Sequence, residues 1–143
     1  MSGAAETTAT PPVRGRCLCG AVRYEYDGPR LWSAYCHCES CRRNTASPVA
    51  AFFGVARAAF RFTGKAPKVY CSSPGVRRSF CADCGTPVAY ESDRFPGEIH
   101  LYAAGLEDPG DYRPQGHVHC AERLAWFDVK DDLPRHAAGG GAS

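Results

Sequence analysis

The sequence lacks any long apolar run. Its longest uncharged apolar stretch, Ser47 to Val55, is far shorter than the roughly 18 residues that a membrane-spanning helix needs. The first 13 residues also lack a basic segment followed by an apolar core, the pattern of a secretory signal peptide. We therefore expect no membrane partner and a cytoplasmic location.

An excess of charge of one sign is also missing. The 17 basic and 15 acidic residues are mixed along the chain, and the formal net charge is only +2. Binding to a phosphate backbone usually requires a strongly basic patch or stripe, so nucleic acid is not an expected partner. The composition, 44% hydrophobic and 22% charged, is typical of a globular protein and excludes a wholly disordered chain.

The length of 143 residues suits one domain. We place this domain at residues 14–135, because residues 1–13 are small, Thr-rich and end at prolines, and residues 136–143 are rich in Ala and Gly. These two ends are expected to form a disordered leader and a disordered tail.

Long stretches of helical periodicity are scarce, whereas short alternating stretches separated by turn residues are frequent. The fold class should be mostly β, with little helix: a turn or two at residues 39–44 and 121–124. In the first clear strand, Val22, Tyr24 and Tyr26 should share one face. The expected strands are residues 21–26, 49–55, 59–63, 68–72, 77–80, 87–91 and 99–102.

Cysteine, by contrast, is abundant. The chain has nine cysteines, and an odd number without a signal peptide does not suit an exported disulfide scaffold. Seven of them form three tight clusters: Cys17-x-Cys19, Cys36-x-Cys38-x-x-Cys41 and Cys81-x-x-Cys84. Thiol groups at such spacing predict metal ligands rather than isolated buried thiols.

The spacing within each cluster explains how the sulfurs could converge. Residues two apart in a strand point to the same side, which would bring Cys17 beside Cys19 and Cys36 beside Cys38. Cys81 and Cys84 suit a knuckle turn that Gly85 closes in the left-handed conformation. Two distant pairs would complete a four-thiolate structural zinc site, but the Cys81 pair could equally join the trio, and iron could replace zinc.

Three motifs together resemble one known family. They are residues 15–24 (GRCLCGAVRY), 36–43 (CHCESCRR) and 80–87 (FCADCGTP), and weaker matches extend over residues 14–135. The chain resembles the glutathione-dependent formaldehyde-activating enzyme family, whose domain is shared with centromere protein V. The resemblance implies a β-tent fold of short antiparallel strands organised around two zinc ions per chain.

The same resemblance divides the cysteines between the two zinc ions. It implies a structural zinc bound by Cys17, Cys19, Cys81 and Cys84, and a catalytic zinc bound by Cys36, Cys38 and Cys41. It also implies a carbon-sulfur lyase activity, the condensation of glutathione with formaldehyde to S-hydroxymethylglutathione. The partners would then be a small-molecule thiol, with glutathione as cosubstrate, and an aldehyde.

Three protein ligands and one open position are typical of a reactive zinc site. Glutathione carries two carboxylates, and Arg42 and Arg43 directly follow the last cysteine of the trio, so they are the first candidates to bind them. Arg77 and Arg78 are weaker candidates. His37 should point away from its flanking cysteines and support the site without binding the metal.

A binding module is the alternative to an enzyme. Both metals would then be structural, and Cys71, Cys120 or a histidine such as His117 or His119 would supply the fourth ligand of the trio. A zinc-ribbon nucleic-acid binder is a third hypothesis, which the near-neutral charge disfavours. Several aromatic residues are expected in the core or a pocket wall: Trp32, Tyr35, Phe52, Phe53 and Trp126.

Overall fold

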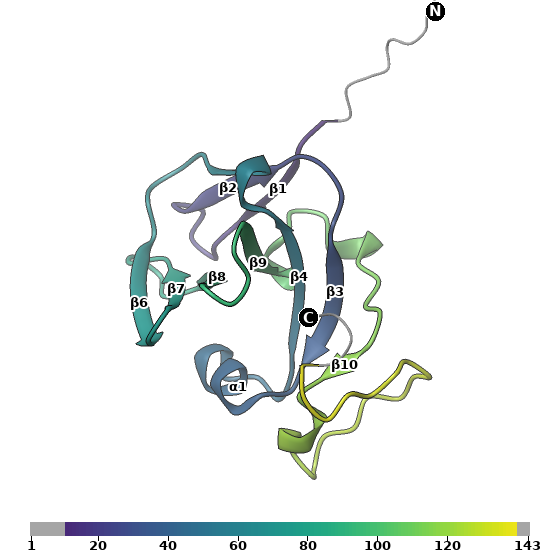
Figure 1. The fold of residues 1–143 in the computed structure, drawn as a ribbon. Helices are drawn as coiled ribbons and strands as arrows, with labels where there is room; N and C mark the ends of the chain where they lie inside the picture. The colour runs from purple at the N-terminus through teal and green to yellow at the C-terminus, as the bar shows by residue number, and fades with distance from the viewer. Residues whose placement is uncertain (1–10, 140–143) are drawn as a thin grey trace, which may run out of the picture.

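The computed structural model describes residues 11–139 and contains two β-sheets and one short α-helix (Figure 1). The mostly β class predicted from the sequence is confirmed. No helix among the described residues is long and apolar enough to cross a membrane.

The smaller sheet has the strand order β1-β2-β5, and both of its pairings are antiparallel. Its strands are β1 (Val13–Arg16), β2 (Arg23–Tyr26) and β5 (Phe60–Phe62). Tyr24 and Tyr26 are both buried, with Val22 just before the strand, as the alternation predicted. Gly15 lies opposite Tyr24, whose ring occupies the space where a Cβ would lie.

The larger sheet has the order β10-β3-β4-β9-β8-β7-β6. All its pairings are antiparallel except that of β10 with β3, which is parallel and was not expected. The strands β1, β3 and β10 were also missing from the predicted set. The bounds are β3 (Trp32–Cys36), β4 (Ala50–Ala56), β6 (Lys68–Ser73), β7 (Val76–Phe80), β8 (Pro87–Ser92), β9 (Glu98–Tyr102) and β10 (His117–Val118).

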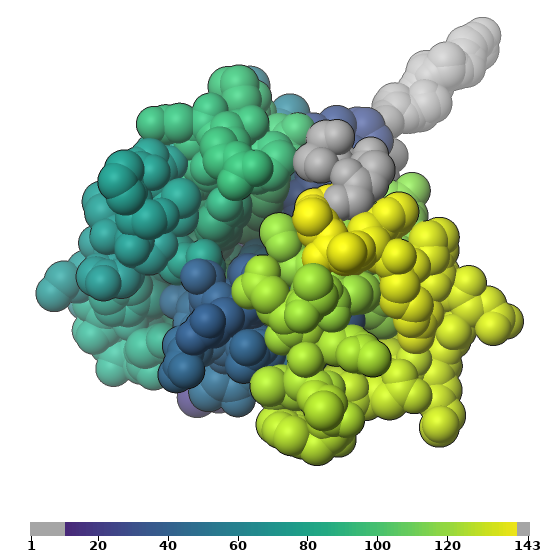
Figure 2. All heavy atoms as spheres, turned by 60° about the horizontal axis from the view of Figure 1, so that its bottom comes forward, coloured from purple at the N-terminus to yellow at the C-terminus, as the bar shows by residue number. Residues whose placement is uncertain are grey.

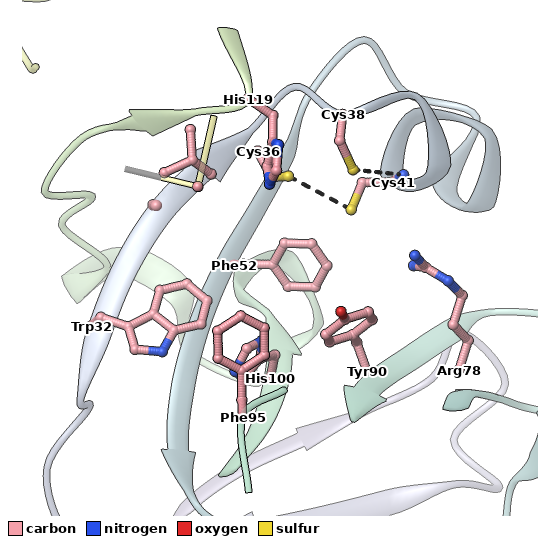
Figure 3. Close-up of a pocket in the computed structure, with 13 residues that line it drawn as sticks. Trp32, Cys36, Cys38, Cys41, Phe52, Arg78, Tyr90, Phe95, His100 and His119 are labelled. Carbon is pink, nitrogen blue, oxygen red and sulfur yellow. Dashed lines mark hydrogen bonds between the residues drawn. The ribbon is translucent and has the colours of Figure 1, made fainter. Parts of the chain in front are cut away.

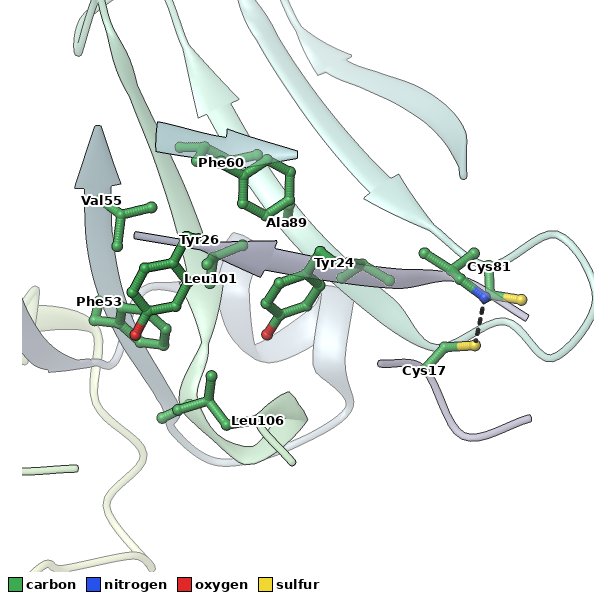
Figure 4. Close-up of a cluster of buried hydrophobic side chains, with 14 residues drawn as sticks. Cys17, Tyr24, Tyr26, Phe53, Val55, Phe60, Cys81, Ala89, Leu101 and Leu106 are labelled. Atoms are coloured by element: carbon green, nitrogen blue, oxygen red, sulfur yellow. Dashed lines mark hydrogen bonds between the residues drawn. The ribbon is translucent and has the colours of Figure 1, made fainter. Parts of the chain in front are cut away.

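The main core lies between the two sheets. Tyr24 and Tyr26 of the small sheet pack with Phe53, Ile99 and Leu101 of the large sheet, and all five side chains are at most 2% exposed. Cys17 and Cys81 lie together at one end of this core (Figure 4). A metal ion bound at this end would therefore border the hydrophobic core of the domain.

Helix α1 (Glu39–Thr45) follows β3 directly, close to the predicted range. Cys38 caps its N-terminus, because the Cys38 sulfur accepts a hydrogen bond from the Cys41 backbone amide at 3.3 Å. The helix ends at Ala46, which has a left-handed φ of 54°. The second predicted helical turn is a 3₁₀ turn at Cys120–Glu122.

The C-terminal segment folds back onto β10. The backbone amide of His136 donates to the His117 carbonyl at 2.8 Å, and the amide of His119 donates to the Ala138 carbonyl at 2.7 Å. The first residues of the expected tail are thus hydrogen-bonded to the domain. In Figure 2 the yellow C-terminal segment lies against the yellow-green segment around Cys120. Residues 140–143 of that tail and residues 1–10 of the expected leader lie outside the described residues.

Candidate metal centres and the adjoining cavity

Four cysteines from two distant parts of the chain bring their sulfurs together. They are Cys17, Cys19, Cys81 and Cys84, and their Sγ atoms all lie within 4.8 Å of one another. The Sγ–Sγ distance is 3.7 Å for Cys17–Cys19 and 3.8 Å for Cys19–Cys81. Four thiolates around a tetrahedral zinc with bonds of about 2.3 Å lie about 3.8 Å apart, so the donor set fits zinc.

Turns, not strands, hold these four sulfurs. Strand β1 ends at Arg16, and the chain turns from Cys17 to Gly20, whose amide donates to the Cys17 carbonyl at 3.2 Å. The expectation that Cys17 and Cys19 converge as alternate residues of a strand is therefore wrong. The knuckle predicted at the second pair is present, since Gly85 has a φ of 80° and its amide donates to the Cys81 carbonyl at 2.8 Å.

Backbone amides and a hydroxyl stabilise negative charge on these sulfurs. The amides of Val22 and Cys84 donate to Cys17 Sγ at 3.3 Å and to Cys81 Sγ at 3.4 Å. A hydrogen bond with the Thr86 hydroxyl, at 3.1 Å, lowers the pKa of the Cys84 thiol to about 5. Donors around the sulfurs favour the thiolate form that binds metal.

The second centre is the cysteine trio, which we define as Cys36, Cys38 and Cys41. The end of β3 supplies Cys36, the N-cap of α1 supplies Cys38, and the first turn of α1 supplies Cys41. The three Sγ atoms lie within 4.8 Å of one another, and Cys36 and Cys41 are 3.6 Å apart. Cys38 is thus outside the strand in which its pairing with Cys36 was expected, and the helix N-terminus brings the sulfurs together.

The three thiols of the trio differ in acidity. Hydrogen bonds from Cys36 and Cys41 lower the pKa of Cys38 to about 2, and the hydrogen bonds with Cys38 and Cys41 raise the pKa of Cys36. Among the described residues, no fourth Cys, His, Asp or Glu joins the trio within the same distance limit. Three converging sulfurs without a fourth protein donor fit a metal with one open position.

A cavity of about 140 Å³ opens from the trio along one face of the large sheet, where side chains of β3, β4, β7, β8 and β9 line it. In Figure 3 the three sulfurs lie at one end, above the Phe52 ring, and Trp32 and His100 lie at the other. Four large aromatic side chains line the wall: Trp32, Phe52, Tyr90 and Phe95. Such a wall makes the surroundings of the sulfurs largely apolar.

Among the described residues that line the cavity, Arg78 is the one with a permanent positive charge. Arg78 is on β7 and only 7% exposed, and its guanidinium carbon lies 5.0 Å from the centre of the Tyr90 ring. Arg42 and Arg43 do not line the cavity. Arg43 points to solvent and forms an ion pair with Glu39 at 2.8 Å. Arg78, one of the two weaker candidates for binding the carboxylates of glutathione, is thus the arginine that lines the cavity beside the trio.

His100 occupies the end of the cavity away from the trio. Its Nε2 lies 2.9 Å from Glu98 Oε1, which also accepts a hydrogen bond from the Trp32 indole at 3.1 Å. Burial lowers the pKa of His100, although the Glu98 carboxylate opposes this effect. No motif in the sequence marks His100, because a lone histidine in a strand carries no local signal.

His37 is buried on the far side of β3 from the cavity and contacts another imidazole, His117. His119 lines the cavity, but its ring nitrogens do not join the three sulfurs of the trio as a possible metal ligand. The other candidates for a fourth ligand also lie outside this group: His117, Cys71 and Cys120. Of the expected aromatic residues, Trp32 and Phe52 line the cavity and Phe53 is in the core. Trp126 is 74% exposed, so its expected place in the core or wall is wrong.

These features define a mostly β protein with one cluster of four cysteines that could hold a metal ion and one cluster of three cysteines that faces a cavity. A family model described as glutathione-dependent formaldehyde-activating enzyme matches residues 12–122. The chain therefore belongs to the glutathione-dependent formaldehyde-activating enzyme family, as the three cysteine motifs indicated.

Two individual proteins are also similar to this chain. A Schizosaccharomyces pombe protein, described as an uncharacterized lyase, is 34% identical over 103 residues, which cover 68% of this chain and 73% of the relative. A crystal structure of a Rhodobacter sphaeroides protein has a TM-score of 0.57 at 24% identity, and the match covers 71% of this chain and 91% of that one. The first likeness supports membership of this family, and the second supports the fold alone.

Proposed function

We propose that this protein is a zinc-dependent carbon-sulfur lyase-type enzyme that joins a thiol to an aldehyde. The proposed pair is glutathione and formaldehyde, which give S-hydroxymethylglutathione. The observation that carries the proposal is the cysteine trio at one end of an aromatic cavity, with no fourth donor among the described residues. Membership of the family and the lyase description of the yeast relative support it.

The reaction forms one bond between sulfur and carbon. The thiolate sulfur attacks the carbonyl carbon, the carbonyl π bond breaks, and the proton that the thiol releases ends on the oxygen. A zinc ion bound by Cys36, Cys38 and Cys41 would lower the pKa of an incoming thiol and keep it nucleophilic at neutral pH.

The side chains of the cavity position the two reactants and exclude bulk water. Its 140 Å³ is below the roughly 300–1,000 Å³ typical of pockets for drug-sized ligands. The cavity suits the thiol end of a tripeptide together with a one-carbon aldehyde, and the rest of the tripeptide lies towards the opening. The rings of Phe52 and Tyr90 confine the aldehyde near the trio, which raises its effective concentration.

The four-cysteine centre has a different role in this proposal. A zinc ion bound by Cys17, Cys19, Cys81 and Cys84 would tie the end of β1 to the turn before β8 and stabilise the fold. The total is two zinc ions per chain. Thiolate centres of this kind require a reducing compartment, so we propose a cytoplasmic location.

Exchange NMR of glutathione with formaldehyde tests the function directly. We expect the zinc-loaded protein to accelerate the exchange above the uncatalysed rate, and Cys38→Ala to lose the acceleration together with one zinc ion. Cys71→Ala is the matched control, because Cys71 is exposed on β6 and outside both centres. Full zinc content and full activity in Cys38→Ala would refute the mechanism.

The NMR assay, together with a measurement of the fourth ligand of the trio, separates the enzyme from a binding module with two structural metals. The module predicts two bound zinc ions, no acceleration and a protein side chain as the fourth ligand of the trio. X-ray absorption spectroscopy with added glutathione distinguishes them, because an open site changes its fourth ligand to the sulfur of the added thiol.

A further inference from the structure

Arg78 is a buried cationic side chain in the cavity wall that lacks a full set of hydrogen-bond partners. Its Nε donates to the Ser72 hydroxyl at 3.1 Å, and its guanidinium stacks over the Tyr90 ring. Arg78 is only 7% exposed, and its Nη1 is buried and has no hydrogen-bond partner. A buried charged donor without a partner is unfavourable, and a ligand that supplies an acceptor relieves this cost.

The surroundings of Arg78 select the kind of ligand. None of the described residues that line the cavity is an aspartate or glutamate, so no carboxylate of the protein lines it to neutralise the guanidinium. Figure 3 shows the guanidinium near Cys41, on the same side of the cavity as Tyr90. A planar fork of donors beside a thiol-binding centre is suited to a carboxylate carried by the thiol compound.

We propose that Arg78 forms a carboxylate subsite that selects thiols bearing an acidic group for the cysteine trio. This inference rests on the proposed function, because it assigns the substrate's anionic group to a position beside the reacting sulfur. It replaces Arg42 and Arg43, which lie outside the cavity, as the recognition group. Neutral thiols would reach the same centre but bind less tightly.

Two small thiols of similar length test this selection. Isothermal titration of the zinc-loaded protein compares 3-mercaptopropionate, which has a carboxylate, with 2-mercaptoethanol, which has a hydroxyl. We expect the wild-type protein to bind 3-mercaptopropionate about 10- to 100-fold more tightly, the range for a hydrogen bond to a charged group. The Arg78→Gln variant should lose most of this ratio, with the affinity for 2-mercaptoethanol little changed.

The neighbouring arginine provides a matched control. Arg77 is on the same strand, but its side chain is 41% exposed and pairs with Asp93 at 3.1 Å. Arg77→Gln should therefore keep the wild-type ratio. If Arg78→Gln does not fold, Arg78→Lys replaces it; this variant keeps the charge without the planar fork, and we expect an intermediate ratio.

A ligand without sulfur separates this proposal from the proposed function. Propionate should give a saturation-transfer NMR signal with the wild-type protein and with Arg77→Gln, and a much weaker one with Arg78→Gln. If neither thiol binds but propionate follows this pattern, the function fails and the subsite stands. Equal binding of the two thiols by the wild-type protein, or an unchanged ratio in Arg78→Gln, would overturn the subsite.

Discussion

The imidazole Nε2 of His37 lies 2.8 Å from Nδ1 of His117, and both rings are buried. His117 Nε2 in turn lies 3.0 Å from the Asp131 carboxylate. A carboxylate accepts only, so a neutral His117 donates from Nε2 to Asp131 and accepts from His37 at Nδ1. This chain connects the residue between two trio cysteines to β10 and the C-terminal segment.

The histidine chain should contribute to stability. His117→Phe keeps a ring of similar shape but leaves the His37 N–H buried without a partner, which costs about 1–3 kcal/mol. We expect urea unfolding of the zinc-loaded protein to show at least this loss. Asp131→Asn retains an oxygen acceptor for His117 and should lose less. An equal loss in both variants would contradict the proposed direction of donation.

The two metal centres should differ in their effect on folding. Cys81→Ser removes a proposed zinc ligand from a cluster that joins segments 62 residues apart at the end of the core, so we expect one zinc ion fewer and a large fall in the melting temperature. Cys41→Ser should also lose one zinc ion, with a smaller fall. Elemental analysis and calorimetry measure both quantities. The reverse order of melting temperatures would show that the trio is the main structural centre.

Gly54 controls the position of the Trp32 ring in the cavity wall. A Cβ at Gly54 would lie 2.7 Å from Trp32 Cε2, closer than side chains tolerate. Gly54→Ala should therefore displace the indole, weaken its hydrogen bond to Glu98, and destabilise the protein by about 1–3 kcal/mol. Denaturant unfolding measures the loss, and indole fluorescence reports the displacement. For comparison, a Cβ at Gly110 meets its nearest atom at 3.7 Å, and Gly110→Ala should leave both unchanged.

His100 should make stability depend on pH. Burial lowers its pKa in the folded state, so below the ordinary value of about 6.5 the unfolded chain binds more protons than the folded one. The free energy of unfolding contributed by His100 is therefore present above pH 6.5 and falls as the pH drops towards the folded-state pKa. Urea unfolding at pH 7.5, 6.5 and 5.5 should show a smaller decrease for His100→Gln than for the wild-type protein.

His119→Gln is the control for this measurement, because its ring also lines the cavity but is 38% exposed. It should retain the wild-type decrease between pH 7.5 and 5.5. The same decrease in all three proteins would show that His100 does not cause the dependence.

Local patterns predicted much of this protein. Alternation placed Tyr24 and Tyr26 in the core, because the side-chain period of a strand is fixed by its backbone. The Cys81 knuckle followed from its spacing and from Gly85, whose left-handed conformation is a local requirement. Strand β10 was missed because two residues carry no periodic signal, and its parallel pairing depends on β3, some 80 residues earlier.

The functional residues divide in the same way. The sequence by itself determined which seven cysteines could bind metal, because thiol spacing within a turn or a helix N-terminus is a local property. The tertiary structure decided that the four-cysteine centre closes at the core and that the trio faces a cavity. It also decided that Arg78 and His100 line this cavity and Arg42 and Arg43 do not. These positions depend on the packing of β7 and β9 in the large sheet, and the long-range contacts that fix such packing leave no pattern within a single stretch of sequence.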